Sequence, residues 1–156
     1  MSICLVDTSI LCELLQVPSM CSDHRSLVKE FKKRIQTDER FLLPMTTILE
    51  TGNHIGQNGD GGERRRAAKR FIDLVTQAIH GTNPFTATPF VTPEALVLWL
   101  QEFEDWAKRN DAKGKGSGLG DLSIHHEWRH QCDLHPMRRV YIWSKDAHLS
   151  SCDREP

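Results

Sequence analysis

The sequence lacks several features that would place it in a specialised class of protein. Its longest apolar run, Ala95 to Leu100, is too short to span a membrane. A formal net charge of -1 leaves no overall field that would attract nucleic acid or a membrane surface. The five cysteines are odd in number and lack the spacing of a disulfide framework, which indicates reduced thiols. No basic leader precedes the first apolar stretch, so we expect a cytoplasmic protein without a membrane segment.

The composition is that of an ordinary globular protein. The chain has 156 residues, of which 38% are hydrophobic and 26% are charged. That length allows a hydrophobic core without help from disulfides or structural metals. We therefore expect one domain that covers residues 1–156.

Short apolar or β-branched runs alternate with segments of helical periodicity. The runs at residues 2–6, 41–43, 88–91 and 140–143 predict strands, the last of which we expect to be the final strand. Helices are expected between them, including one that begins near Asp23, one that ends at Gly81 and one that begins at Thr92 and Pro93. This order predicts an α/β fold: a single Rossmann-like domain with a mainly parallel central sheet flanked by helices.

Four acidic residues stand at the junctions between these elements. Asp7 follows the first strand, Glu50 lies in the first turn of the helix after the second, Asp121 begins a helix, and Asp146 follows the strand at 140–143. Taken singly, each is typical of a helix cap, and the segment from Thr47 to Glu50 matches a capping box. In a parallel sheet, however, such junctions meet in one crevice at the carboxyl ends of the strands.

Four carboxylates in one crevice repel one another and raise one another's pKa unless a cation neutralises them. Mg²⁺ and Mn²⁺ accept carboxylate oxygens, keep bound waters and bind phosphate oxygens at the same time. The pattern therefore predicts a site for Mg²⁺ or Mn²⁺ that is held by Asp7, Glu50, Asp121 and Asp146.

The same residues carry a resemblance to a known family. The segment Ile3-Cys-Leu-Val-Asp7-Thr-Ser9 resembles the opening strand and first acid of the PIN-domain family of metal-dependent ribonucleases. Thr47-Ile-Leu-Glu50 is similar to the helix with the second acid, and Gly120-Asp121-Leu-Ser-Ile124 to the third. Tyr141-Ile-Trp-Ser144-Lys-Asp146 is similar to the last strand with its hydroxyl and fourth acid. The order and spacing of these motifs cover nearly the whole chain.

The resemblance implies a PIN-like fold and a Mg²⁺- or Mn²⁺-dependent endoribonuclease that cleaves RNA phosphodiester bonds. Many members of the family are toxins of bacterial toxin-antitoxin pairs, which implies a small antitoxin protein and a homodimer as partners. Ser9 and Ser144 are supporting residues that would orient a carboxylate or contact phosphate, with local capping as the alternative. Many relatives have another acid two residues after the fourth, where this sequence has His148, a candidate ligand or substrate contact.

Basic clusters are the candidate RNA-binding surface, because acidic site residues oppose phosphate. Arg65, Arg66, Lys69 and Arg70 are predicted to point outward from a helix, and Lys113 and Lys115 lie in the loop before Asp121. A further cluster contains Lys29, Lys32, Lys33 and Arg34. For each cluster, the alternative is a solvated helix face.

Other readings of the sequence stay open. The segment His126-Glu127-Trp-Arg-His130 matches the H-E-x-x-H pattern of zinc peptidases, in which Glu127 would be the general base, but the sequence offers no well-spaced third ligand. A non-catalytic nucleic-acid-binding module would use the cluster near Arg65 and would need no carboxylate site. A housekeeping nuclease is the alternative to a toxin. The identity of the RNA, and the choice between RNA and DNA, cannot be read from the sequence.

Overall fold

A computed structural model describes residues 1–109 and 116–156 of the chain. Its strands form one sheet in the order β3-β2-β1-β4-β5. The strands are β1 (Ser2–Val6), β2 (Glu39–Leu43), β3 (Phe85–Ala87), β4 (Val140–Trp143) and β5 (Asp153–Arg154). All neighbouring pairs are parallel except β4 with β5. This confirms the predicted α/β class with a mainly parallel sheet.

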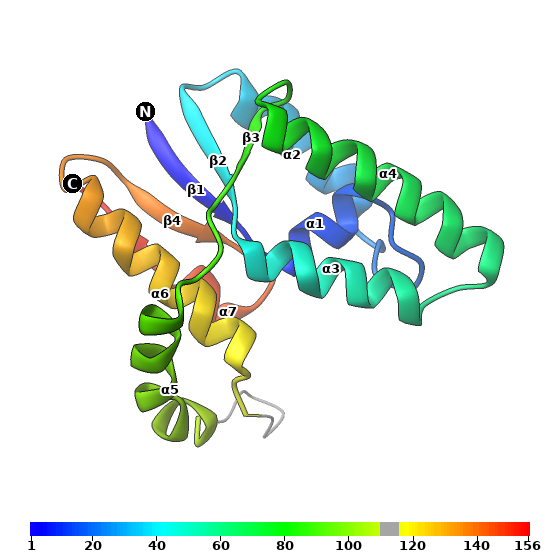
Figure 1. Cartoon of the computed structure of the whole chain (residues 1–156). Coiled ribbons are helices and arrows are strands. Elements are labelled where there is room, and N and C mark those ends of the chain that lie inside the picture. The colour runs from blue at the N-terminus through cyan, green and yellow to red at the C-terminus, as the bar shows by residue number, and fades with distance from the viewer. Residues whose placement is uncertain (110–115) are drawn as a thin grey trace.

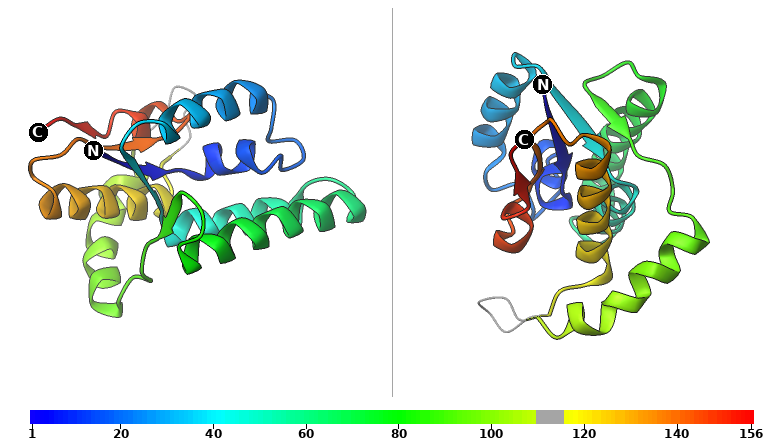
Figure 2. Two further views of the ribbon diagram at one scale, coloured as in Figure 1. Left: turned by 90° about the horizontal axis from the view of Figure 1, so that it is seen from above. Right: turned by 90° about the vertical axis from the view of Figure 1, so that its left-hand side faces the viewer.

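Helices connect the strands and cover both faces of the sheet. They are α1 (Thr8–Leu14), α2 (His24–Ile35), α3 (Met45–Gln57), α4 (Gly61–His80), α5 (Pro93–Ala107), α6 (Leu119–Leu134) and α7 (Ala147–Ser150). Helices α2 and α6 lie on opposite sides of the sheet (Figure 2, left), while α3 and α4 pair and extend away from it (Figure 1). None of the described helices is long and apolar enough to cross a membrane.

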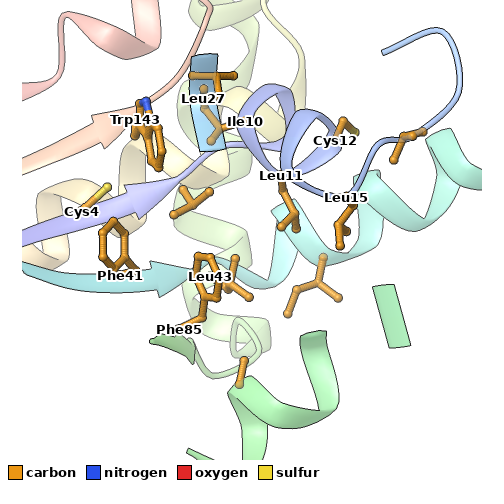
Figure 3. Close-up of a cluster of buried hydrophobic side chains, with 14 of the residues drawn as sticks. Cys4, Ile10, Leu11, Cys12, Leu15, Leu27, Phe41, Leu43, Phe85 and Trp143 are labelled. Carbon is orange, nitrogen blue, oxygen red and sulfur yellow. The ribbon is translucent and has the colours of Figure 1, made fainter. Parts of the chain in front are cut away.

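The alternation of apolar side chains along the strands divides the core in two. Cys4 and Val6 of β1 face one side, where Phe31 of α2 stacks on Phe85 with ring centroids 5.1 Å apart. Figure 3 shows this cluster between β1, β2 and α1. Ile3 and Leu5 face the other side, which α6 covers. A strand buried on both faces explains why the first run of the sequence is continuously apolar.

Several predicted helix ends are confirmed. The Thr92 side chain accepts from the Ala95 N–H, and Pro93 occupies the first helical position of α5. Gly81 ends α4 with a φ of 68°, a left-handed conformation that favours glycine. Asp60, for which no cap was predicted, begins α4 with a capping box that it forms with Glu63.

Two strand predictions are wrong. The third strand is Phe85–Ala87 rather than residues 88–91, because Thr88 turns its hydroxyl to the Met45 N–H, 3.2 Å away, and Pro89 has no N–H to donate to a ladder. Residues 140–143 do form β4, but they are not the last strand. Asp153 pairs with Tyr141 in the short antiparallel β5 that follows.

The predicted capping box at Thr47 is also wrong. Helix α3 begins two residues earlier, after Pro44, without a side-chain cap. The Thr47 hydroxyl instead donates to the Val6 carbonyl of β1 at 2.8 Å. Glu50 therefore lies in the second turn of α3 rather than the first, and its carboxylate is free for other partners.

Helix α5 is packed less tightly than its apolar pattern predicts. Trp106 is buried, but Leu100 is 49% exposed although it belongs to the longest apolar run. Leu96, Trp99 and Phe103 are half-buried. Figure 1 shows the reason: α5 lies against α6 rather than against the sheet, so only one narrow side of it is covered.

Candidate functional site

The four predicted acids are positioned by the carboxyl ends of parallel strands. Strands β1, β2 and β4 lead into α1, α3 and α7, and these helices begin at the same edge of the sheet (Figure 1). Asp7 is the N-cap of α1 and Asp146 is the N-cap of α7. Glu50 is on α3, and Asp121 is the third residue of α6, which begins after Gly118. We call these four residues the carboxylate edge.

Asp7 is the most buried member, with 8% of its surface exposed. Its Oδ2 atom accepts from the hydroxyls of Ser9 and Ser144, both at 2.7 Å, and from the Ser9 N–H at 3.3 Å. The sequence motifs of β1 and β4 thus meet at one carboxylate oxygen. Both serines thus contact this carboxylate, and their supporting role in a reaction stays a prediction.

Glu50 is fixed by contacts from two other helices. Its Oε2 atom accepts from the Thr8 hydroxyl of α1 at 2.9 Å. Its Oε1 atom lies against Gly120, where an added Cβ would stand only 1.8 Å away. Only glycine leaves room for this approach, so Gly120 lets the Glu50 carboxylate reach the first turn of α6, where Asp121 lies.

Asp121 shows that the four charges act on one another. Burial, followed by the charges of Asp7, Asp146 and Glu50, raises the pKa of Asp121 to about 6. A backbone N–H at Gly118 opposes the shift only weakly. Because all three other acids contribute, the carboxylate edge is one electrostatic unit.

Asp146 is exposed and caps the short helix α7. Its Oδ1 atom accepts from the N–H groups of His148 at 2.8 Å and Leu149 at 3.1 Å. Its own N–H donates to the Ser144 hydroxyl at 2.9 Å. One carboxylate oxygen, Oδ2, is therefore left without a capping bond. The exposed side chain of His148 lies in the first turn beyond it, and its predicted role remains a prediction.

Lys145 ties the loop between Ser144 and Asp146 to the protein. Its ammonium group lies 2.7 Å from Oε1 of Glu13 and 2.7 Å from Oδ2 of Asp23. Glu13 is only 1% exposed and also accepts from the Asp23 N–H at 3.1 Å. The hydrogen bonds from Lys145 to these two carboxylates raise the pKa of Lys145. The ion pairs therefore connect the loop to α1 and to the beginning of α2.

The predicted RNA-binding residues have different surroundings. Arg65, Arg66 and Lys69 are exposed on α4, as predicted. The prediction that Arg70 points outward is wrong, because its guanidinium donates to the carbonyls of Leu15 and Gln16 at 2.8 and 3.1 Å. Arg70 thus completes the hydrogen bonding at the end of α1. Lys113 and Lys115 lie outside the described residues.

The H-E-x-x-H segment lies on α6, but its side chains have other partners. The ring of His126 stacks on Trp99, and its Nε2 is 3.4 Å from the Glu102 carboxylate. Glu127 accepts from Gln131 at 2.8 Å, and His130 is exposed. These histidines line a groove of about 710 Å³ between α3, α5 and α6. No third ligand joins them within residues 1–109 and 116–156.

The carboxylate edge is the second candidate metal site. In the part of the chain that the structure describes, no three His, Cys, Asp or Glu side chains are drawn closely enough together to hold a metal ion as they stand. The charge distribution nevertheless fits a cation, since three carboxylates together raise the pKa of a fourth. Carboxylate oxygens are also the ligands that Mg²⁺ and Mn²⁺ prefer. A divalent ion would remove the repulsion that this edge now carries.

Four residues of the site were not singled out from the sequence. Thr8 lies between Asp7 and Ser9, and Gly120 directly precedes Asp121. Their position next to a predicted acid is the one sequence feature that could have identified them. Lys145 stands between two predicted site residues in the same way. Its partner Glu13 gave no signal, because nothing in the run from Leu11 to Leu15 marks that carboxylate as buried.

Comparisons with known proteins agree with the fold. No family model matches the chain, and no curated protein matches it. A solved structure of FitAB bound to an IR36 DNA fragment is similar, with a TM-score of 0.57 and 15% sequence identity. The match covers 96% of this chain and 89% of that chain. At this identity the likeness shows the fold, which is PIN-like, as the sequence resemblance implies.

Proposed function

We propose that the protein is a divalent-metal-dependent endoribonuclease. The observation that carries the proposal is the placement of Asp7, Glu50, Asp121 and Asp146 at one edge of the sheet, where burial and then the charges of the other three acids raise the pKa of Asp121. Repulsion among these negative charges destabilises the folded protein, and a nuclease that binds a metal cation there gives a functional reason for it. The PIN-like fold and the resemblance of the four acidic motifs support the same activity.

In this proposal, Asp7, Glu50, Asp121 and Asp146 hold Mg²⁺ or Mn²⁺, directly or through waters. When bound, such an ion activates water and stabilises the negative charge that develops on phosphate. The chain's own contribution is orientation: Ser9 and Ser144 fix one oxygen of Asp7, and Thr8 fixes one oxygen of Glu50. Among the described residues, the other oxygen of each of these two carboxylates accepts no hydrogen bond.

RNA would be held by basic side chains around the edge. Arg65, Arg66 and Lys69 remain candidates on α4, and Lys113 and Lys115 remain candidates before α6. Arg70 is a weaker candidate, since carbonyls of the protein already occupy its guanidinium. These contacts are electrostatic, so we propose that they bind the phosphate backbone rather than a base sequence.

We further propose that the protein is the toxin of a toxin-antitoxin pair, with a small antitoxin and a second copy of itself as partners. The support is the sequence resemblance together with the similarity to FitAB, which was solved bound to a DNA fragment. A neighbouring reading frame for a small antitoxin-like protein would favour the toxin over a housekeeping nuclease.

The proposed activity is tested by incubating the purified protein with end-labelled RNA in Mg²⁺, in Mn²⁺ and in EDTA. We expect internal cleavage with either ion and intact RNA in EDTA. RNA that is bound but never cut would favour the non-catalytic binding module. Peptide cleavage that is lost in Glu127→Gln, together with stoichiometric zinc, would favour the peptidase.

A further inference from the structure

Helix α2 carries a row of cations on its outer face. Arg25, Lys29, Lys32 and Lys33 are all exposed, and we call them the α2 basic row. At 100° per residue they project opposite to Leu27, which is buried in the core. With Val28 and Gln36 they line a shallow hollow of about 340 Å³. One face of a single helix therefore presents four positive charges together.

The stability of α2 accounts for only part of this row, because Lys32 and Lys33 lie in the last turn, where the helix dipole favours cations, but Arg25 and Lys29 do not. Arg25 and Lys29 are both positive and lie four residues apart, as do Lys29 and Lys33. Charges of the same sign at this spacing destabilise a helix. Arg25 also lies in the first turn, where the helix dipole disfavours a cation. Among the described residues, none of the four forms an ion pair, whereas Arg34 on the inner face pairs with Glu30. The row is thus an uncompensated charge that an external anion would neutralise.

The beginning of α2 is linked to the loop that carries Asp146. Asp23, the residue before α2, contacts Lys145, which directly precedes Asp146. Arg25 stands two residues after Asp23 on the exposed side of the helix. From there the row leads away from the edge for eight residues, or about 12 Å at the helical rise. The row is therefore a line of positive charges whose first member follows the residue that contacts the loop before Asp146.

We propose that the α2 basic row binds the phosphate backbone of the RNA strand on one side of the cleaved bond. The inference rests on the proposed function, because it assumes that RNA occupies the carboxylate edge. A nucleic-acid strand carries evenly spaced negative charges in a line, which matches a row of cations better than a compact anion does. The row holds the strand by charge alone and reads no base sequence.

The test compares RNA binding by the wild type and by the variant Arg25→Gln, Lys29→Gln, Lys32→Gln. Binding of an unstructured 20-nucleotide RNA is measured in EDTA at several salt concentrations, so that the result does not depend on cleavage. Each lost phosphate contact removes about 0.7 units of log-log salt slope for a single strand, so we expect a slope lower by about two units. Between 1 M and 0.1 M salt, the affinity of the wild type should therefore rise about 100-fold more than the affinity of the variant. The single variant Arg25→Gln should show about one third of the change in slope.

A matched control separates the row from net charge. The variant Lys108→Gln, Arg129→Gln, Arg138→Gln removes the same number of cations from other surfaces and should keep the wild-type slope. Equal losses in both variants would overturn the proposal, as would an unchanged slope in the α2 variant. Binding of poly-glutamate, a model for an acidic protein, is measured for the same proteins. If the α2 variant loses poly-glutamate binding but keeps RNA binding, the proposal is overturned and the row is assigned to an acidic protein. If the protein cleaves RNA but the α2 variant binds RNA like the wild type, this inference fails and the proposed function does not.

Discussion

We expect the variant Asp7→Asn to lose at least about 100-fold of the RNA cleavage rate while it keeps its fold. The asparagine oxygen can accept the three hydrogen bonds that Oδ2 of Asp7 receives from Ser9 and Ser144. The substitution removes the charge and replaces the second oxygen, which is the atom available to a cation. Cleavage rates in Mn²⁺ and thermal melts of the same samples measure both effects.

The variant Asp73→Asn is the control for this result. Asp73 is also a helical aspartate, but it is exposed on α4 away from the strand ends. Its loss should leave the rate of cleavage unchanged. If Asp7→Asn cleaves RNA as fast as the wild type, the carboxylate edge is not the site of the reaction.

The variant Asp121→Asn should be more stable than the wild type above pH 6 in the absence of divalent ions. The folded-state pKa of about 6 is higher than the ordinary aspartate value of about 3.9. The folded protein therefore binds more protons than the unfolded chain between these values, and wild-type stability falls as the pH rises through them. After allowance for partial exposure, the charge costs the folded state about 1–2 kcal/mol at pH 7.5.

Urea unfolding of both proteins at pH 3.5 and pH 7.5 in EDTA measures this difference. We expect the advantage of Asp121→Asn to appear at pH 7.5 and to be absent at pH 3.5, where both proteins are neutral at this position. The variant Asp73→Asn should show no such change with pH. A constant difference at the two pH values would mean that the other three acids do not act on Asp121.

The position of the acids could be predicted because it depends on local features of the sequence. Asp7 directly follows a strongly apolar run and Asp146 stands three residues after another, and a parallel sheet brings such junctions to one edge. Pairing of β1 with both β2 and β4 fulfils that expectation. The fold class and the edge at which the acids lie could therefore be predicted from the sequence.

Contacts between distant elements could not be predicted in this way. The approach of Glu50 to Gly120 depends on how α3 packs against α6, and no pattern in either segment encodes it. The burial of Glu13 depends likewise on Lys145, which is far along the chain. Strand β3 was misplaced and strand β5 was missed, because three and two residues are too few to show periodicity.

Calorimetric titration of the wild type with Mn²⁺ at pH 7.5 tests the central claim most directly, with the double variant Asp121→Asn, Asp146→Asn beside it. The carboxylate edge predicts saturable binding by the wild type and little or none by the double variant, with melting curves that show both proteins folded. Equal binding by the two proteins, or no binding by the wild type, would contradict a metal site at this edge.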